Sequence, residues 1–132
     1  MSLLVPVSWG ELLDKICILQ IKLERMNDAE KRRNVGHELG LLVSVRDREI
    51  SGSTELDDLV TGLRQVNERL WDIEDAIRLC ERSQDFGSMF IELARAVYRT
   101  NDLRAGLKYQ MNALLGSGMI EEKSYEPYET RI

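Results

Sequence analysis

Histidine and cysteine are scarce in this chain of 132 residues, which holds one histidine and two cysteines. A carboxylate-bridged di-metal bundle needs Glu-x-x-His pairs on two helices, and His37 has no acidic residue three positions before it. A Ser-His-Asp or Cys-His site would depend on His37 alone, with no nucleophile placed beside it. Walker, Gly-x-Gly-x-x-Gly and Cys-x-x-Cys motifs are also missing. We therefore expect no metal and no cofactor, and the sequence identifies no catalytic residue.

Long apolar runs and an excess of basic charge are missing as well. No run approaches the ~18–20 apolar residues that cross a bilayer, so no membrane span is expected. The net charge is −5, whereas nucleic-acid binders usually carry a basic footprint, so no nucleic-acid partner is expected. The start of the chain lacks the basic region of a signal peptide, which makes a cytoplasmic location the default. Without a secretion signal, Cys17 and Cys80 are predicted to be buried thiols rather than a disulfide.

What the chain does have is apolar residues at helical spacing. In its middle they follow steps of three and four residues, which is typical of a coiled-coil seam. These residues are Leu56, Leu59, Leu63, Val66, Leu70, Ile73, Ile77 and Cys80. Similar spacing and the short polar turns between the apolar segments predict four helices, over residues 8–26, 28–50, 55–82 and 88–115.

The predicted fold class is therefore all-α, with four helices in two antiparallel hairpins that form a bundle. One domain over residues 1–118 is followed by a flexible C-terminal tail over residues 119–132. The third helix is longer than the first two, so part of its seam is expected to meet a second subunit. This predicts a homodimer.

Three local features carry predictions of their own. Ser8 and Glu11 have the spacing of a capping box, in which each side chain accepts the backbone N–H of the other residue. Gly36 and Gly40 lie one turn apart inside a helix, where each costs about 1 kcal/mol relative to alanine. Close approach of another helix is the preferred explanation, and a ligand lying against the backbone is the other. The basic run 31–33 opposes the dipole of its helix, so neighbouring acids or a bound anion should offset it.

The last helix holds an anomaly. Its three-and-four spacing assigns Thr100 and Arg104 to core positions, where an unpaired charge would be expensive. One interpretation is a polar pocket in which Arg104, with Arg99 or Arg95 nearby, holds an anionic ligand. The other is a kink at residues 100–102 that shifts the register and turns Leu103 inward. The kink is the commoner arrangement, and we favour it.

Four segments resemble a known family, and they span nearly the whole chain. They are Val5–Lys22, Leu70–Asp75, Ala96–Asp102 and Glu121–Tyr125. The family that they resemble consists of short all-helical bacterial proteins, is classed as a domain of unknown function, and is often described alongside glycosyltransferases of surface-polysaccharide assembly. The resemblance implies a signature of mostly polar residues, namely Gly10, Glu11, Asp14, Lys15, Lys22, Trp71, Asp72, Arg99, Asn101 and Asp102.

A second likeness is weaker. Residues 13–16 and the later Lys22 are similar to the first helix of all-helical chorismate mutases, which hold a dicarboxylate between basic side chains. The chain departs from that pattern at Leu13, where those enzymes have an arginine. On this likeness the protein would be a small helical enzyme that grips an anionic substrate.

The function predicted first is a non-catalytic interaction module linked to glycosyl transfer or surface-polysaccharide assembly. The enzyme that binds an anion is the alternative. In the interaction module, the charged residues of the first helix and the 98–102 segment would recognise a protein partner or a small anion. In the enzyme, an anionic substrate would be gripped by Lys15, Lys22, Arg99 and Arg104. The candidate binding residues are Glu11, Asp14, Lys15, Lys22, Tyr98, Arg99, Asn101, Asp102 and Arg104.

Overall fold

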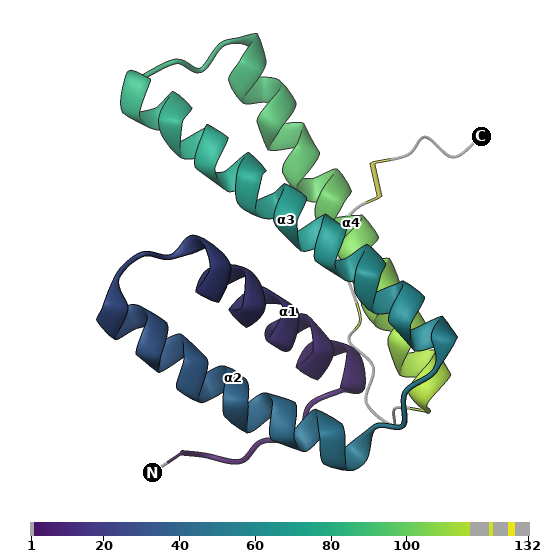
Figure 1. Ribbon diagram of the computed structural model, residues 1–132. Helices are drawn as coiled ribbons and strands as arrows, with labels where there is room; N and C mark the ends of the chain where they lie inside the picture. Colours follow the sequence, from purple (N-terminus) through teal and green to yellow (C-terminus); the bar gives the residue numbers. More distant parts are fainter. Residues whose placement is uncertain (1, 117–121, 123–126, 129–132) are drawn as a thin grey trace, which may run out of the picture.

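The computed structural model describes residues 2–116, 122, 127 and 128. Within them the chain forms four α-helices and no strand: α1 Trp9–Arg25, α2 Ala29–Glu49, α3 Thr54–Ser83 and α4 Ser88–Leu115 (Figure 1). This confirms the all-α, four-helix fold. The predicted tail over residues 119–132 lies outside the described residues, apart from Glu122, Pro127 and Tyr128. No helix in the described part of the chain is long and apolar enough to cross a membrane.

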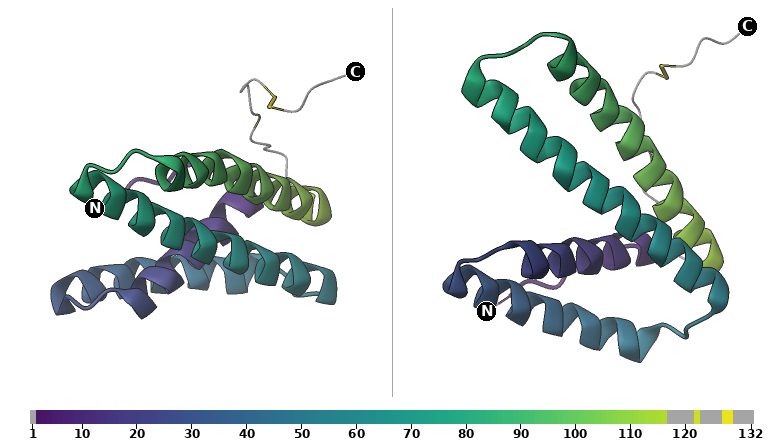
Figure 2. Two further views of the ribbon diagram at one scale, coloured as in Figure 1. Left: turned by 90° about the horizontal axis from the view of Figure 1, so that it is seen from above. Right: turned by 45° about the horizontal axis from the view of Figure 1, so that its top comes forward.

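α1 is the central element of the fold. The helices form two antiparallel hairpins, α1–α2 and α3–α4, and α1 lies between α2 and the second hairpin (Figure 2). α1 contacts each of the other three helices, whereas α2 contacts α1 alone. Burial follows this arrangement, because α1 is buried on most of its sides while no residue of α2 is buried. The apolar residues of α2 that were expected to face the core are half-buried: Val35, Leu39, Leu42 and Val43.

The hydrophobic core lies where α1 crosses the first half of α3 and the last half of α4. Its buried residues come from these three helices: Leu13, Cys17, Ile21, Leu56, Leu63 and Met111. Along α3, Ile73 is the last buried residue of the predicted seam. The outer part of the α3–α4 hairpin, residues 74–99, extends past α1 (Figure 1), and none of its residues is buried. We call residues 74–99 the arm.

The glycines of α2 are not sites of close helix packing. A Cβ added at Gly36 or Gly40 would meet no atom within 4 Å. The prediction that another helix approaches them is therefore wrong, because α2 has a helix on one side only.

Arg32, in the basic run at the start of α2, has a structural role. Arg32 donates to the carbonyl oxygens of Leu23 and Met26, the latter at 3.2 Å. The carbonyls at the end of a helix lack partners within the helix and carry partial negative charge. Arg32 therefore caps the C-terminus of α1 and offsets the dipoles at this turn.

Candidate functional site

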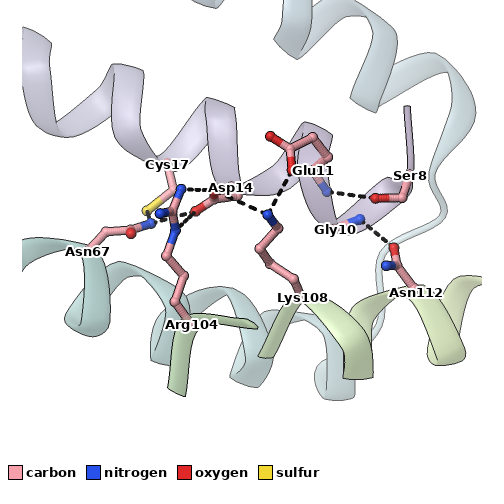
Figure 3. Close-up of polar contacts among 9 residues, drawn as sticks. All are labelled: Ser8, Gly10, Glu11, Asp14, Cys17, Asn67, Arg104, Lys108 and Asn112. Atoms are coloured by element: carbon pink, nitrogen blue, oxygen red, sulfur yellow. Dashed lines mark hydrogen bonds and ion pairs between the residues drawn. The ribbon is translucent and has the colours of Figure 1, made fainter. Parts of the chain in front are cut away.

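A buried carboxylate lies at the centre of the polar contacts between α1, α3 and α4 (Figure 3). Asp14 is only 1% exposed. Its Oδ1 accepts hydrogen bonds from Asn67 Nδ2 at 2.9 Å and from Arg104 Nε at 3.1 Å, and its Oδ2 accepts a second bond from Arg104. The ammonium nitrogen of Lys108 lies 3.9 Å from the same Oδ2. Asp14 thus binds one residue of α3 and two of α4, and we call these four residues the Asp14 cluster.

The anomaly of the last helix is explained by this cluster and not by a kink. α4 runs without a break from Ser88 to Leu115, Thr100 is buried, and Leu103 is exposed. The preferred prediction of a kink that turns Leu103 inward is therefore wrong. Arg104 occupies a core-facing position because the carboxylate of Asp14 lies opposite it, and a bidentate pair satisfies a planar guanidinium well.

The N-terminus of α1 is held to α4 by two further contacts. The backbone N–H of Gly10 donates to Asn112 Oδ1 at 2.7 Å, and Lys108 Nζ donates to Glu11 Oε2 at 2.7 Å. The capping box is confirmed only in its first half, because Ser8 Oγ accepts from the backbone N–H of Glu11 at 3.2 Å. The carboxylate of Glu11 turns instead to Lys108 and links the cap to the Asp14 cluster.

Cys17 adjoins the cluster, since Asn67 Nδ2 also lies 3.4 Å from its sulfur. Burial raises the pKa of the Cys17 thiol above its ordinary value of 9.0, and the charge of nearby Asp14 acts in the same direction. The hydrogen bond from Asn67 opposes this shift. Cys17 is therefore a neutral, apolar member of the core and not an activated nucleophile.

The raised pKa of Cys17 predicts a pH dependence of stability. Above pH 9.0 the unfolded chain loses the thiol proton more readily than the folded chain. The contribution of the Cys17 thiol to the free energy of unfolding is fully present below that pH, and it is lost as the pH rises through the pKa of the folded state. We expect the free energy of unfolding to fall between about pH 8 and pH 10 more steeply in the wild type than in Cys17→Ala. Urea titrations at each pH measure the difference between the two slopes.

Two open clefts adjoin the cluster, one on each side of Arg104. The first, of about 370 Å³, lies between α1, α2 and Arg104 and is lined by Glu11, Asp14, Lys15, Ile18, Leu19, Lys22, Glu38 and Arg104. The second, of about 330 Å³, lies between α1, α3 and α4 and is lined by Ile18, Ile21, Asn67, Leu70, Trp71, Glu74, Asn101 and Arg104. Ile18 and Arg104 line both clefts, so we describe the two together as the Arg104 groove.

The groove brings six of the nine predicted site residues together. Glu11, Asp14 and Arg104 belong to both the polar contacts and the groove. Lys15, Lys22 and Asn101 line the groove, and Lys15 Nζ forms an ion pair with Glu38 at 3.1 Å.

The other three predicted site residues do not line the groove. Tyr98 contacts the ring of Tyr128, with centroids 5.3 Å apart, and the guanidinium of Arg99 lies 3.8 Å from Glu92. Asp102 is exposed on α4.

Three residues that complete these contacts were not predicted from the sequence: Asn67, Lys108 and Asn112. A signal for two of them was present, because Thr100, Arg104, Lys108 and Asn112 follow one another in steps of four, and all except Arg104 are buried. Such a polar row on one side of a helix indicates a polar partner opposite it. Within the described residues no buried side-chain nitrogen or oxygen lacks a hydrogen-bond partner. Asn67 had a weaker signal, as a polar residue beside the apolar seam of α3.

Residues 3–131 match a family of unknown function, DUF6165. The chain belongs to this family. No curated protein and no solved structure matches the chain. The match covers nearly the full length, which agrees with a resemblance carried by segments from both ends of the sequence.

Several signature residues implied by the family resemblance have structural contacts here. Gly10, Glu11 and Asp14 join α1 to α4. Trp71 and Asp72 contact Arg25, whose guanidinium carbon lies 5.7 Å from the ring centroid of Trp71 and whose Nη1 lies 2.6 Å from Asp72 Oδ1. This part of the signature therefore describes how α1 is held against the α3–α4 hairpin.

Proposed function

We propose that the protein is a cytoplasmic, non-catalytic interaction module whose Arg104 groove binds a protein of a glycosyl-transfer or surface-polysaccharide assembly system. The observation that supports this most is the balance of charge in the groove. The cleft beside α2 is lined by the cations Lys15, Lys22 and Arg104 and by the acids Glu11, Asp14 and Glu38. A small anion would meet as many carboxylates as cations there, whereas a polar protein surface can offer both signs of charge.

The ion pairs of the cations support the same proposal. An enzyme that grips a dicarboxylate needs cations directed at its substrate, as the alternative function requires of Lys15, Lys22, Arg99 and Arg104. Arg104 binds the buried Asp14, Lys15 binds Glu38, and Arg99 lies beside Glu92. An anionic substrate would have to displace these carboxylates, so the geometry favours the interaction module.

Site-specific photo-crosslinking in native cells tests the proposal. With p-benzoylphenylalanine in place of Lys22 or of Asn101, one from each cleft of the groove, we expect cross-links to the same protein, identified by mass spectrometry as a glycosyl-transfer or polysaccharide-assembly component. The same group in place of His37, which is exposed on α2, is the control and should not give this product. Cross-linking to an unrelated protein, or equal cross-linking from position 37, would contradict the proposal.

Thermal unfolding separates the alternative function from this one. The wild type and Lys22→Ala are heated with chorismate, prephenate, sugar nucleotides, phosphate or sulfate. A ligand at a hundred times its dissociation constant adds about 2.7 kcal/mol of stability. A saturable shift from one of these anions that is lost in Lys22→Ala would favour the enzyme, whereas the interaction module predicts no such shift.

A further inference from the structure

One side of α4 carries a regular row of exposed side chains. Met89, Glu92, Ala96, Arg99 and Leu103 follow one another in steps of three, four, three and four, so they lie along one side of the helix. Met89 is 64% exposed and Leu103 is 56% exposed. Ala96 is half-buried, and the charged side chains of Glu92 and Arg99 are exposed. We call these five residues the α4 stripe.

Every residue of the stripe except Leu103 lies in the arm, whose own packing is incomplete. Two helices share a single interface, so the seam residues of the arm, such as Ile77, Leu93 and Val97, are only half-buried. α1 does not cover them, because its last residue, Arg25, contacts Asp72 at the base of the arm. An arm of this kind gains apolar burial when further helices pack on it.

We propose that the α4 stripe is the interface of a homodimer, in which two arms pack antiparallel about a two-fold axis at Ala96. A two-fold interface must be complementary to itself. Reversal of the stripe about Ala96 places Met89 level with Leu103 of the partner subunit, and it places Glu92 within one residue, about 1.5 Å along the helix axis, of Arg99 of the partner subunit. The apolar ends meet, each acid faces a base, and the smallest side chain lies on the axis, where the helices come closest.

The charges of the stripe are already arranged for this exchange. Arg99 Nη2 lies 3.8 Å from Glu92 Oε2 within one chain, Arg95 Nη1 lies 3.3 Å from Glu92 Oε1, and all three side chains are exposed. The side chains of Glu92 and Arg99 therefore extend along the stripe toward each other. In an antiparallel dimer, Glu92 would again face an arginine and Arg99 would again face a glutamate, now from the partner subunit. Another protein would have to match this order of groups by chance, whereas a second copy matches it by symmetry.

The proposed dimer is independent of the proposed function. Asn101, which lines the Arg104 groove, lies about 140° round the helix from Ala96, since each residue advances about 100°. Tyr98, which contacts Tyr128, lies about 160° away by the same count. Pairing through the stripe therefore leaves the groove open, and loss of the dimer does not remove the cross-linking expected at Lys22.

Sedimentation velocity of a matched pair of variants tests the interface. Leu103→Glu and Ile91→Glu make the same change on the same helix at sites of nearly equal exposure, 56% and 54%, and only Leu103 belongs to the stripe. At about 1 to 100 µM, we expect the wild type and Ile91→Glu to sediment as dimers and Leu103→Glu as a monomer. Circular dichroism should show the same helix content in all three. A monomeric wild type, or equal dissociation by both substitutions, would overturn the proposal.

A charge exchange tests the antiparallel register. Glu92→Arg alone and Arg99→Glu alone each place two like-charged pairs in the symmetric interface, so each should weaken dimerisation by about tenfold or more. The double variant Glu92→Arg/Arg99→Glu restores opposite charges and should dimerise like the wild type. A double variant as weak as either single variant would overturn the antiparallel arrangement.

Discussion

Replacing Asp14 with asparagine is expected to lower the free energy of unfolding by about 3 kcal/mol, at the low end of the range for breaking a buried ion pair. Asparagine keeps the shape of the side chain but removes the charge that faces Arg104 and Lys108. Its amide nitrogen also turns a donor toward groups that are themselves donors. The loss stays at the low end because the Arg104 side chain is 28% exposed and water can screen part of its charge. Urea unfolding followed by circular dichroism measures the change.

Asp72→Asn is the matched control for this prediction. Asp72 also forms an ion pair with an arginine, Arg25 Nη1 at 2.6 Å, but its side chain is 69% exposed. Exposed pairs contribute about 0.2–1 kcal/mol, so this variant should lose no more than that. Equal losses in Asp14→Asn and Asp72→Asn would show that Asp14 does not hold the helices together.

A double-mutant cycle shows which contact carries the effect. If the pair with Arg104 dominates, Asp14→Asn and Arg104→Gln together should cost less than the sum of the two single losses. The difference is expected to be about 1–3 kcal/mol, as for residues in direct contact. Additive losses would assign the effect to the other neighbours of Asp14.

The fold was predictable from the sequence because its signals are local. The seam from Leu56 to Cys80 and the cap at Ser8 each depend on residues only a few positions apart in the chain. Gly116 ends α4 in the left-handed conformation, at φ 66°, which suits a glycine. Such features require no knowledge of which helix lies beside which. The packing of α2 on α1 alone was not predictable, because the apolar pattern of α2 fits packing on one helix as well as on several.

The polar site was predictable only in part, because its contacts join distant parts of the chain. Asp14 and Arg104 are 90 residues apart. Arg104 at a core-facing position fits either a kink or a buried acid opposite, and the choice depends on whether α1 packs on α4. The row from Thr100 to Asn112 in steps of four favours the second arrangement, since a kink would not keep four polar residues on one side. The packing of α1 on α4 also explains Gly10, which lies against the backbone of Lys108 and donates its N–H to Asn112. Helix propensities and capping patterns do not predict this contact.

Replacing Gly10 with alanine is expected to lower the free energy of unfolding by about 2–3 kcal/mol, as overpacking does in a close interface. The added Cβ would lie 2.6 Å from the Lys108 carbonyl oxygen and 3.1 Å from the Lys108 Cα. Both are backbone atoms in the interior of α4, so no side chain can rotate to make room. α1 and α4 must move apart, which lengthens the bond from the Gly10 N–H to Asn112 and the bond between Lys108 and Glu11.

Gly36→Ala separates this steric effect from helix propensity. Gly36 lies inside α2 with no atom within 4 Å of an added Cβ, so alanine there should raise stability by up to about 1 kcal/mol. The same helix propensity favours alanine at Gly10. If urea unfolding shows that Gly10→Ala lowers stability while Gly36→Ala raises it, the difference is due to the contact of α1 with α4. A Gly10→Ala variant as stable as Gly36→Ala would show that α1 does not approach Lys108 this closely. The Asp14 cluster rests on the same approach, so it would have to be rejected as well.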